Sequence, residues 1–398
     1  MDKKNKNPNV PTLRFAGYID NYRTCKLIDI SEIITRTNEN NSEYPIMMIS
    51  AGKGFIAQSE KYSRDNAGTS INKYILLKKG ELAYNRGNSK QFPYGAIYEM
   101  KEEYALIPYV YHCFNIYNGS TRYFSYYLNS PFKDEQLSKI ITSSVRGNGL
   151  LNISKKDFFN LSLNVPSIKE QNKIANFLDL IENRIQTQIK IIDDYSSVKD
   201  YIIKDYFQKC REYIDLGNSF KYGKAGGTPK SSNKEYYDGD IPFLGIADIT
   251  SQGKYINHTS KSLTQKGLIN SSAWLVPKNS LILSMYASVG LPTINKIPLA
   301  TSQAMMSMIF EDELDVEFVY YYLCYFKKNK IRSLLETGTQ SNINADTVKS
   351  IKVPKLKADE KERITNIFIK IDQLINNEKQ ILNLLQKQKN FLLKNMFV

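Results

Sequence analysis

The sequence is poor in histidine and cysteine. It has two histidines, His112 and His258, in 398 residues, and its four cysteines form no CxxC pair. A structural zinc site needs clustered cysteine and histidine ligands, and histidine is the most frequent general acid or base in enzymes. We therefore expect no metal site, no histidine-based catalysis and four reduced thiols.

Membrane segments and nucleotide-binding loops are also missing. No apolar run approaches the roughly 20 residues that span a bilayer, and the first residues, MDKKNKNPNVP, lack the apolar core of a secretory signal. Residues 217–225, GNSFKYGKA, come near a phosphate-binding loop, but the spacing of the glycines is wrong and alanine follows the lysine. We expect a cytoplasmic protein without catalytic residues of its own.

Positive charge is in excess. Lys and Arg outnumber Asp and Glu by 54 to 40, which gives a net charge of +14. An excess of this size favours a polyanionic partner, either nucleic acid or an anionic membrane surface. The 28 tyrosines belong either to the core or to a surface that contacts bases and phosphates.

The second half of the chain repeats a pattern of the first half. When Glu170 is placed over Glu360, 38 residues align without a gap and nine pairs are identical, ending with Phe207 over Phe397. The offset of 190 residues is close to half of the chain. The sequence therefore predicts two tandem halves, each of which ends in one of these segments.

Both segments have the pattern of a long helix with one apolar stripe. Ser167 with Glu170, and Asp359 with Glu362, have the spacing of an N-cap residue and its N3 carboxylate. Apolar residues follow at alternating steps of four and three residues, which is the spacing of a coiled-coil interface. The predicted interface residues are Ile174, Leu178, Ile181, Ile185, Ile192, Ile202, Ile364, Phe368, Ile371, Ile375, Leu382, Leu385 and Leu392.

Polar residues interrupt the two stripes at equivalent positions. Gln188 and Glu378 form one pair of interruptions, and Lys199 and Lys389 form the other. Because the stripes match in length and in these breaks, we predict that the two helices pair with each other in an antiparallel coiled coil. Alternatively, each helix packs only on its own domain or mediates dimerisation with a second chain.

The stretches before each helix resemble one another more weakly. Residues 44–56 and 241–256 both read as strand, glycine-containing turn and strand, and residues 145–166 and 336–354 both read as a polar loop followed by a last strand. We predict an α+β fold in which two β-rich domains are joined by the two long helices, as a pseudo-twofold tandem repeat.

These features resemble the specificity subunits of type I restriction–modification systems. Residues 9–30, NVPTLRFAGYIDNYRTCKLIDI, are similar to the opening segment of that family, and residues 226–249, GGTPKSSNKEYYDGDIPFLGIADI, resemble the start of its target recognition domains. Residues 167–185, SIKEQNKIANFLDLIENRI, resemble the start of its central conserved helix. The resemblance covers nearly the whole chain.

The resemblance implies a non-catalytic subunit that reads DNA. It implies a first target recognition domain at 1–165, a central conserved helix at 166–209, a second target recognition domain at 210–355 and a C-terminal conserved helix at 356–398. Each domain would read one half of a bipartite target in double-stranded DNA, and the helices would fix the spacer and dock two methyltransferase subunits. A restriction subunit with translocase and nuclease activity would join them, and S-adenosylmethionine, ATP and Mg²⁺ are expected on these partners.

Polar, basic and glycine-containing loops are the candidates for contacts with DNA. Arg, Lys, Asn, Gln, Ser and Thr side chains reach phosphates and base edges. The predicted DNA-binding residues are Lys53, Asn85, Arg86, Asn88, Lys90, Arg146 and Asn148 in the first half, and Thr228, Lys230, Ser231, Tyr286, Ser288, Gln303, Gln340 and Asn342 in the second. Of these we favour Arg86 and Gln340, and we expect Arg86→Ala to weaken specific DNA binding and leave the fold intact.

A different reading is a structural or tethering protein whose coiled coil mediates assembly and whose charge gives non-specific affinity for nucleic acid. An enzyme such as a nuclease with an unfamiliar site is a further alternative, against which the lack of acidic clusters counts.

Overall fold

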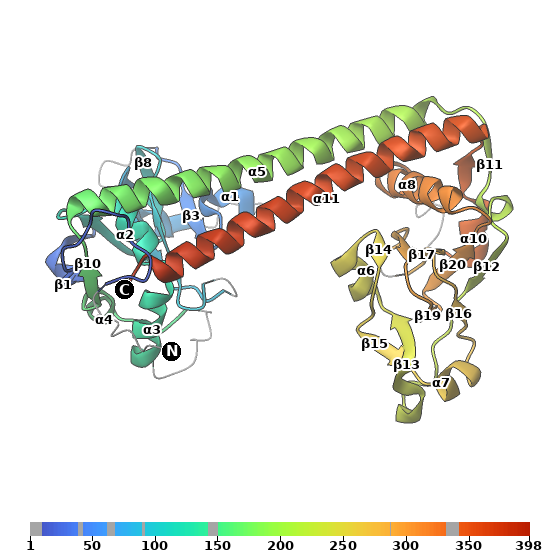
Figure 1. Cartoon of the computed structure of the whole chain (residues 1–398), viewed down its shortest axis with the longest axis horizontal. Coiled ribbons are helices and arrows are strands. Elements are labelled where there is room, and N and C mark those ends of the chain that lie inside the picture. Colours follow the sequence, from blue (N-terminus) through green and yellow to red (C-terminus); the bar gives the residue numbers. More distant parts are fainter. Residues whose placement is uncertain are drawn as a thin grey trace. The chain divides into compact units, whose positions relative to one another are not determined.

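The structure is a computed structural model that describes residues 10–38, 43–61, 68–89, 92–141, 150–286, 288–331 and 342–398. These residues form two compact units. Unit 1 contains the described residues up to Ile189 and those from Gln380 onward, and unit 2 contains those from Lys190 to Lys379. Each unit has one globular part and one half of each long helix, α5 (Ile168–Lys209) and α11 (Ala358–Asn395) (Figure 1). None of the described helices is long and apolar enough to cross a membrane.

The globular part of unit 1 is built on an antiparallel sheet with the order β2–β9–β6–β7. Two antiparallel pairs, β3–β4 and β5–β8, lie beside one another through a parallel bridge between Ile46 and Leu106. A third pair, β1–β10, leads into α5. The elements are β1 (Arg23–Lys26), η1 (Leu27–Asp29), β2 (Ser31–Ile34), β3 (Met47–Ser50), β4 (Gly54–Ala57), α1 (Gln58–Lys61), η2 (Gly68–Lys73), β5 (Ile75–Lys78), β6 (Leu82–Asn85), β7 (Ala96–Glu99), β8 (Tyr104–Ile107), β9 (His112–Ile116), α2 (Thr121–Tyr127), α3 (Pro131–Ile140), α4 (Lys155–Phe159) and β10 (Ser162–Val165).

Unit 2 repeats the strand order of the main sheet. Its main sheet runs β12–β20–β17–β18 and adds β14 at the edge, and a second sheet runs β15–β13–β19–β16. The pair β11–β21 leads into α11, as β1–β10 leads into α5. The elements are β11 (Tyr213–Asp215), η3 (Leu216–Asn218), β12 (Tyr222–Ala225), η4 (Lys234–Tyr236), β13 (Tyr237–Leu244), α6 (Ile246–Gln252), β14 (Tyr255–Ile256), β15 (Lys261–Leu263), α7 (Gln265–Ile269), β16 (Leu275–Val276), β17 (Leu281–Ser284), β18 (Pro292–Asn295), β19 (Leu299–Thr301), β20 (Met305–Ile309), α8 (Glu313–Asn329), α10 (Ala345–Ser350) and β21 (Lys352–Pro354).

The predicted α+β fold with an internal repeat is confirmed by this shared order. The units differ after the last strand of the main sheet, where the described residues of unit 1 form two short helices, α2 and α3, and those of unit 2 form the longer helix α8. Pro131 is the first residue of α3. Proline has no backbone N–H and its ring clashes with the preceding turn of a helix, so it begins a new helix rather than extending α2.

The long helices contribute to the core of each unit. In unit 1, Ile174 and Leu178 of α5 pack in one apolar cluster with Leu392 of α11. In unit 2, Phe207 of α5 and Phe368 of α11 share a cluster with the tyrosines of α8, and their ring centroids lie 5.9 Å apart. Within each unit the two helices run in opposite directions, since residues near the start of one lie beside residues near the end of the other.

The second pair of polar interruptions forms ion pairs between the helices. In unit 2 the Lys199 Nζ lies 2.5 Å from the Asp372 Oδ1, and in unit 1 the Lys389 Nζ lies 2.5 Å from the Glu182 Oε2. These two pairs are equivalent in the repeat, because each lysine and each acid recurs after 190 residues. Apolar seams tolerate partly buried charges when they are paired, and such pairs favour one register.

The predicted interface residues lie inside the helix pair to different degrees. The buried ones are Ile174, Leu178, Ile185, Ile192, Ile364, Phe368, Ile375, Leu385 and Leu392, and the half-buried ones are Ile181, Ile202, Ile371 and Leu382.

Candidate nucleic-acid interface

In unit 2, four loops that are distant in sequence meet beyond the ends of the main-sheet strands. The Thr228 side chain donates a hydrogen bond to the Gln303 Oε1. The N–H of Met285 donates to the carbonyl of Ala304 at 2.7 Å, and the N–H of Ile343 donates to the carbonyl of Met285 at 3.0 Å. Loops around residues 228, 286, 303 and 342 therefore form one continuous surface.

Two glycines fix the first of these loops. A Cβ on Gly226 would lie 2.1 Å from the carbonyl oxygen of Thr301, and one on Gly227 would lie 2.2 Å from the Ser272 Oγ. Only glycine allows the backbone to approach so closely. The hydroxyl of Tyr237 donates to the carbonyl of Pro229 at 2.7 Å and secures the far side of the loop. The GGTP…YY motif thus acts as the scaffold of this surface.

The structure brings most of the predicted residues of unit 2 to this surface. All of those that it describes are exposed, namely Thr228, Lys230, Ser231, Tyr286, Ser288, Gln303 and Asn342. Gln340 lies outside the described residues. Exposed amide, hydroxyl, aromatic and ammonium groups on adjoining loops are suited to base edges and phosphates.

Unit 1 shares one of these contacts between loops. The N–H of Leu151 donates to the carbonyl of Arg86 at 3.0 Å, in the way that Ile343 donates to Met285 in unit 2. Lys53 is exposed in the β3–β4 turn and Asn88 is exposed after β6. The Asn85 side chain accepts the N–H of Gly87 at 2.9 Å and shapes this loop. Lys90, Arg146 and Asn148 lie outside the described residues.

Arg86 is turned toward the fold of unit 1. Its guanidinium donates to the carbonyl of Ile153 at 3.2 Å and to that of Val110 at 3.4 Å. In unit 2 the equivalent residue is Met285, whose side chain is buried. Contact of Arg86 with DNA stays a prediction. The effect of Arg86→Ala on the fold also stays a prediction, and the two hydrogen bonds that the substitution removes should lower the free energy of unfolding.

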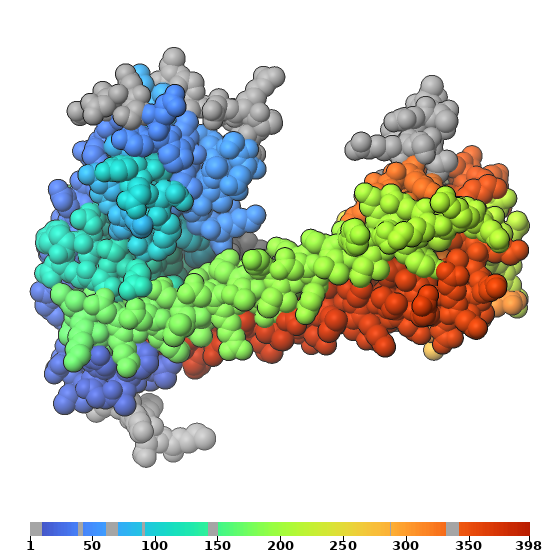
Figure 2. All heavy atoms as spheres, turned by 90° about the horizontal axis from the view of Figure 1, so that it is seen from above, coloured from blue at the N-terminus to red at the C-terminus, as the bar shows by residue number. Residues whose placement is uncertain are grey.

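The long helices carry a second apolar stripe, which the sequence did not lead us to predict. On α11, Ile367 and Leu374 in unit 2 and Ile381, Leu384 and Phe391 in unit 1 are exposed. Most of these side chains are seven residues apart. This heptad spacing outside the main seam could have predicted the second stripe. On α5, Leu180, Val198 and Tyr201 are also exposed. Figure 2 shows the outer sides of both helices at the surface, in green and red. Large exposed apolar side chains in a row mark an interaction surface.

No group of three or more metal-binding side chains occurs among the residues that the structure describes. The surface has the chemistry of a binding site.

Comparisons with known proteins agree with this arrangement. Residues 211–387 match the family model described as type I restriction modification DNA specificity domain. The chain is 27% identical over 226 residues to the type I restriction enzyme MjaIX specificity subunit of Methanocaldococcus jannaschii, a match that covers 56% of this chain and 49% of that protein. It is 26% identical over 421 residues to the putative type I restriction enzyme MjaX specificity subunit of the same organism, covering 96% and 94%. The chain thus spans about half of one relative and nearly all of the other.

Solved structures show the same fold. The S subunit of a type I restriction–modification system from M. genitalium matches with a TM-score of 0.57 and 15% identity, over 98% of this chain and 99% of that chain.

Proposed function

We propose that this chain, which belongs to the specificity subunits of type I restriction enzymes, binds double-stranded DNA and reads one half of a bipartite target with each unit. The observation that carries the proposal is the meeting of exposed polar loops in unit 2, with Gln303 and Asn342 on that surface, together with the matching contact between loops in unit 1. Such loops reach base edges, and the net charge of +14 supplies phosphate contacts.

The half-site reading is tested with substitutions confined to unit 2. Gln303→Ala and Asn342→Ala should relax or change one half of the methylated target, with a loss of about 1–3 kcal/mol for each base contact removed. The other half should stay as in the wild type. The readout is the set of methylated sites in a randomised DNA library, and Lys278→Ala, at an exposed lysine of the same unit, is the control. An unchanged target in both variants would contradict the assignment.

We propose that the helices also set the spacer between the two half-sites. Seven residues inserted after Ile189 and seven after Lys379 keep the heptad pattern and lengthen each helix by about 10 Å. The preferred spacer should then grow by about three base pairs, at 3.4 Å for each base pair. Insertions of four residues at the same points break the heptad pattern and serve as the control. An unaltered spacer after the seven-residue insertions would remove this part of the proposal.

The second apolar stripe is the proposed docking surface for two methyltransferase subunits. Leu384 is 64% exposed on α11 and Leu180 is 67% exposed on α5, and exposure of this kind costs a protein solubility unless a partner covers it. Leu180→Glu and Leu384→Glu should each weaken assembly with the methyltransferase and leave the melting temperature unchanged. Gln386→Glu, at an exposed polar position of α11, is the matched control.

The same proposal gives the chain no catalytic step. S-adenosylmethionine, ATP and Mg²⁺ would be bound by the methyltransferase and restriction subunits, and the complex would work in the cytoplasm, where the DNA is. The surface of polar loops in unit 2 favours a DNA-reading subunit over a tethering protein, which needs no such surface.

A further inference from the structure

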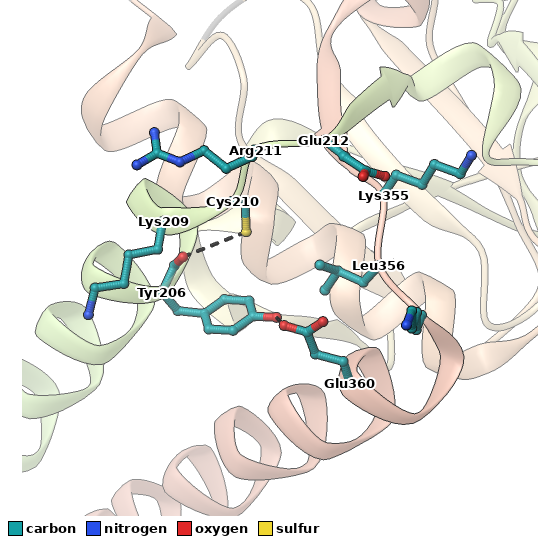
Figure 3. A pocket seen from close by; sticks show the side chains of 9 residues that line it. Tyr206, Lys209, Cys210, Arg211, Glu212, Lys355, Leu356 and Glu360 are labelled. Atoms are coloured by element: carbon teal, nitrogen blue, oxygen red, sulfur yellow. Dashed lines mark hydrogen bonds between the residues drawn. The ribbon is translucent and has the colours of Figure 1, made fainter.

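A pocket of about 460 Å³ lies in unit 2, where α5 ends and α11 begins (Figure 3). The hydroxyl of Tyr206 donates to the Glu360 Oε1 at 2.9 Å, and the Cys210 thiol donates to the carbonyl of Tyr206 at 3.6 Å. The side chains of Tyr206, Cys210 and Leu356 give the pocket an apolar part, whereas Lys209, Arg211 and Lys355 extend outward at the rim (Figure 3). Its lining residues are Tyr206, Lys209, Cys210, Arg211, Glu212, Lys355, Leu356, Lys357 and Glu360.

The equivalent place in unit 1 is occupied by a segment of the chain itself. Glu170, the counterpart of Glu360, accepts two hydrogen bonds of 2.8 Å from the Arg14 guanidinium and one of 3.3 Å from the Tyr22 hydroxyl. The Arg14 guanidinium also lies 4.9 Å from the centre of the Tyr22 ring. As a result Glu170 is only 1% exposed, whereas Glu360 is exposed.

The same segment covers the next turns of α5. Phe15 packs edge-on against Phe177, with ring centroids 5.6 Å apart. The counterpart of Phe177 is Ile367, which is 41% exposed. This part of the repeat can therefore hold an extended segment, and in unit 2 the described residues leave it uncovered.

The charge of the uncovered site differs from that of the covered one. The pocket of unit 2 is lined by the cations Arg211, Lys355 and Lys357, where unit 1 has the uncharged residues Tyr22, Val165 and Ser167. Two acids, Glu212 and Glu360, also line the pocket, and the counterpart of Glu212 is Arg23. These three cations form no ion pair within the described part of the chain, whereas Lys209 lies 2.7 Å from Asp205. Because these cations outnumber the two acids of the lining, the pocket favours a segment with carboxylates over a second arginine-bearing segment.

The pocket is continuous with the proposed docking surface. Glu360 is seven residues before Ile367, and Ile367 is seven before Leu374, so all three share one side of α11. An occupant of the pocket would meet the apolar stripe without a gap.

From these observations we propose that the pocket receives an extended segment of one methyltransferase subunit, with an apolar side chain against Tyr206 and Leu356 and carboxylates against Arg211, Lys355 and Lys357. The proposal rests on the function proposed above. It implies that the two methyltransferase subunits are held differently, because in unit 1 residues 13–15 already cover the equivalent place.

The test uses the full chain and its methyltransferase subunit without DNA. Lys355→Glu with Lys357→Glu reverses the charge of the rim, and Lys261→Glu with Lys278→Glu makes the same change of charge on exposed lysines elsewhere in unit 2. Mass photometry counts the bound methyltransferase subunits at several salt concentrations. The rim variant should bind one of its two methyltransferase subunits about tenfold more weakly and with less dependence on salt. The control pair should bind both as the wild type does.

Wild-type affinity and salt dependence in the rim variant would overturn the proposal. If the wild-type chain itself bound no methyltransferase, the proposed function would fail instead, so the two failures are distinguishable. A photo-crosslinking residue at position 356 gives an independent readout in the otherwise wild-type complex. Crosslinks to an acidic segment of the methyltransferase would support the proposal, and crosslinks only to a neutral or basic segment would contradict it.

Discussion

Unit 1 and unit 2 share one strand order, yet they hold the ends of the long helices in different ways. In unit 1 the first turn of α5 carries a buried acid, Glu170, that is bound by Arg14. In unit 2 the first turn of α11 carries an exposed acid, Glu360, that meets only the Tyr206 hydroxyl among the described residues. The apolar core preserves the fold of the repeat, while the polar contacts around it diverge and give each unit its own surface.

The two units also differ in the partners of the acid that pairs with the lysine of the helix seam. The Asp372 carboxylate in unit 2 lies within hydrogen-bonding distance of Lys199, Lys254 and the Tyr321 hydroxyl. Lys254 belongs to the globular part of unit 2, so this network ties that part to both helices. In unit 1, Glu182 meets Lys389 and Gln186, both of which lie on the helices.

The largest expected effect is at the buried acid of unit 1. Arg14→Ala leaves the Glu170 charge buried without its cation, which should lower the free energy of unfolding by about 3–5 kcal/mol. Tyr206→Phe, the matched change in unit 2, removes one hydrogen bond from the exposed Glu360 and should cost about 1 kcal/mol or less. Denaturant unfolding followed by circular dichroism measures both. Equal losses would contradict the contrast between the two acids.

The buried histidine of unit 1 should make the stability of the protein depend on pH between about 6.5 and 4. Burial, followed by the nearby charge of Arg86, lowers the pKa of His112 to about 4. In the unfolded chain the His112 imidazole takes up a proton near pH 6.5, and in the folded chain only near pH 4. The contribution of neutral His112 to stability is therefore complete above pH 6.5 and is lost as the pH falls toward 4. The strand pairing makes buried Met306 the counterpart of His112.

His112→Met should therefore flatten the dependence of the free energy of unfolding on pH between 6.5 and 4, where the wild type loses roughly 3 kcal/mol through this group. Urea titrations at several pH values provide the comparison, with His258→Met, at the exposed histidine of unit 2, as the control. A wild-type pH profile in the His112→Met variant would show that other groups dominate.

A smaller difference is expected between the two acids of the helix pair. Burial raises the pKa of Asp372. The charge of Lys199 and the hydrogen bonds that Lys199 and Tyr321 donate to the carboxylate outweigh this, so the pKa lies below its ordinary value. Asp372→Asn leaves Lys199 and Lys254 without their shared acid and should cost about 2 kcal/mol, whereas Glu182→Gln should cost about 1 kcal/mol or less. Thermal unfolding of both variants tests which substitution destabilises the protein more. A larger loss of stability in Glu182→Gln would contradict the prediction.

Part of the fold and of the candidate site could be predicted from particular residues. The recurrence of Lys199 at position 389 predicted matched polar breaks, and the GGTP motif located the loop whose close approach to Thr301 requires glycine. Arg86 was chosen because it follows a strand-like run in a polar loop. Its orientation depends on the carbonyls of Val110 and Ile153, which the local sequence does not position.

The sequence by itself determined the repeat, the two helices and the heptad seam, because the pairing of helices follows from the local spacing of apolar residues along each of them. Only the tertiary structure decided that Arg14 lies on Glu170, 156 residues away, that Glu182 and Asp372 neutralise the lysines of the seam, and that the counterpart of Glu170 opens into a pocket. These contacts join residues distant in sequence, and their geometry arises from the packing of whole units, since a charged side chain is held in place only where the surrounding fold brings its partner within reach.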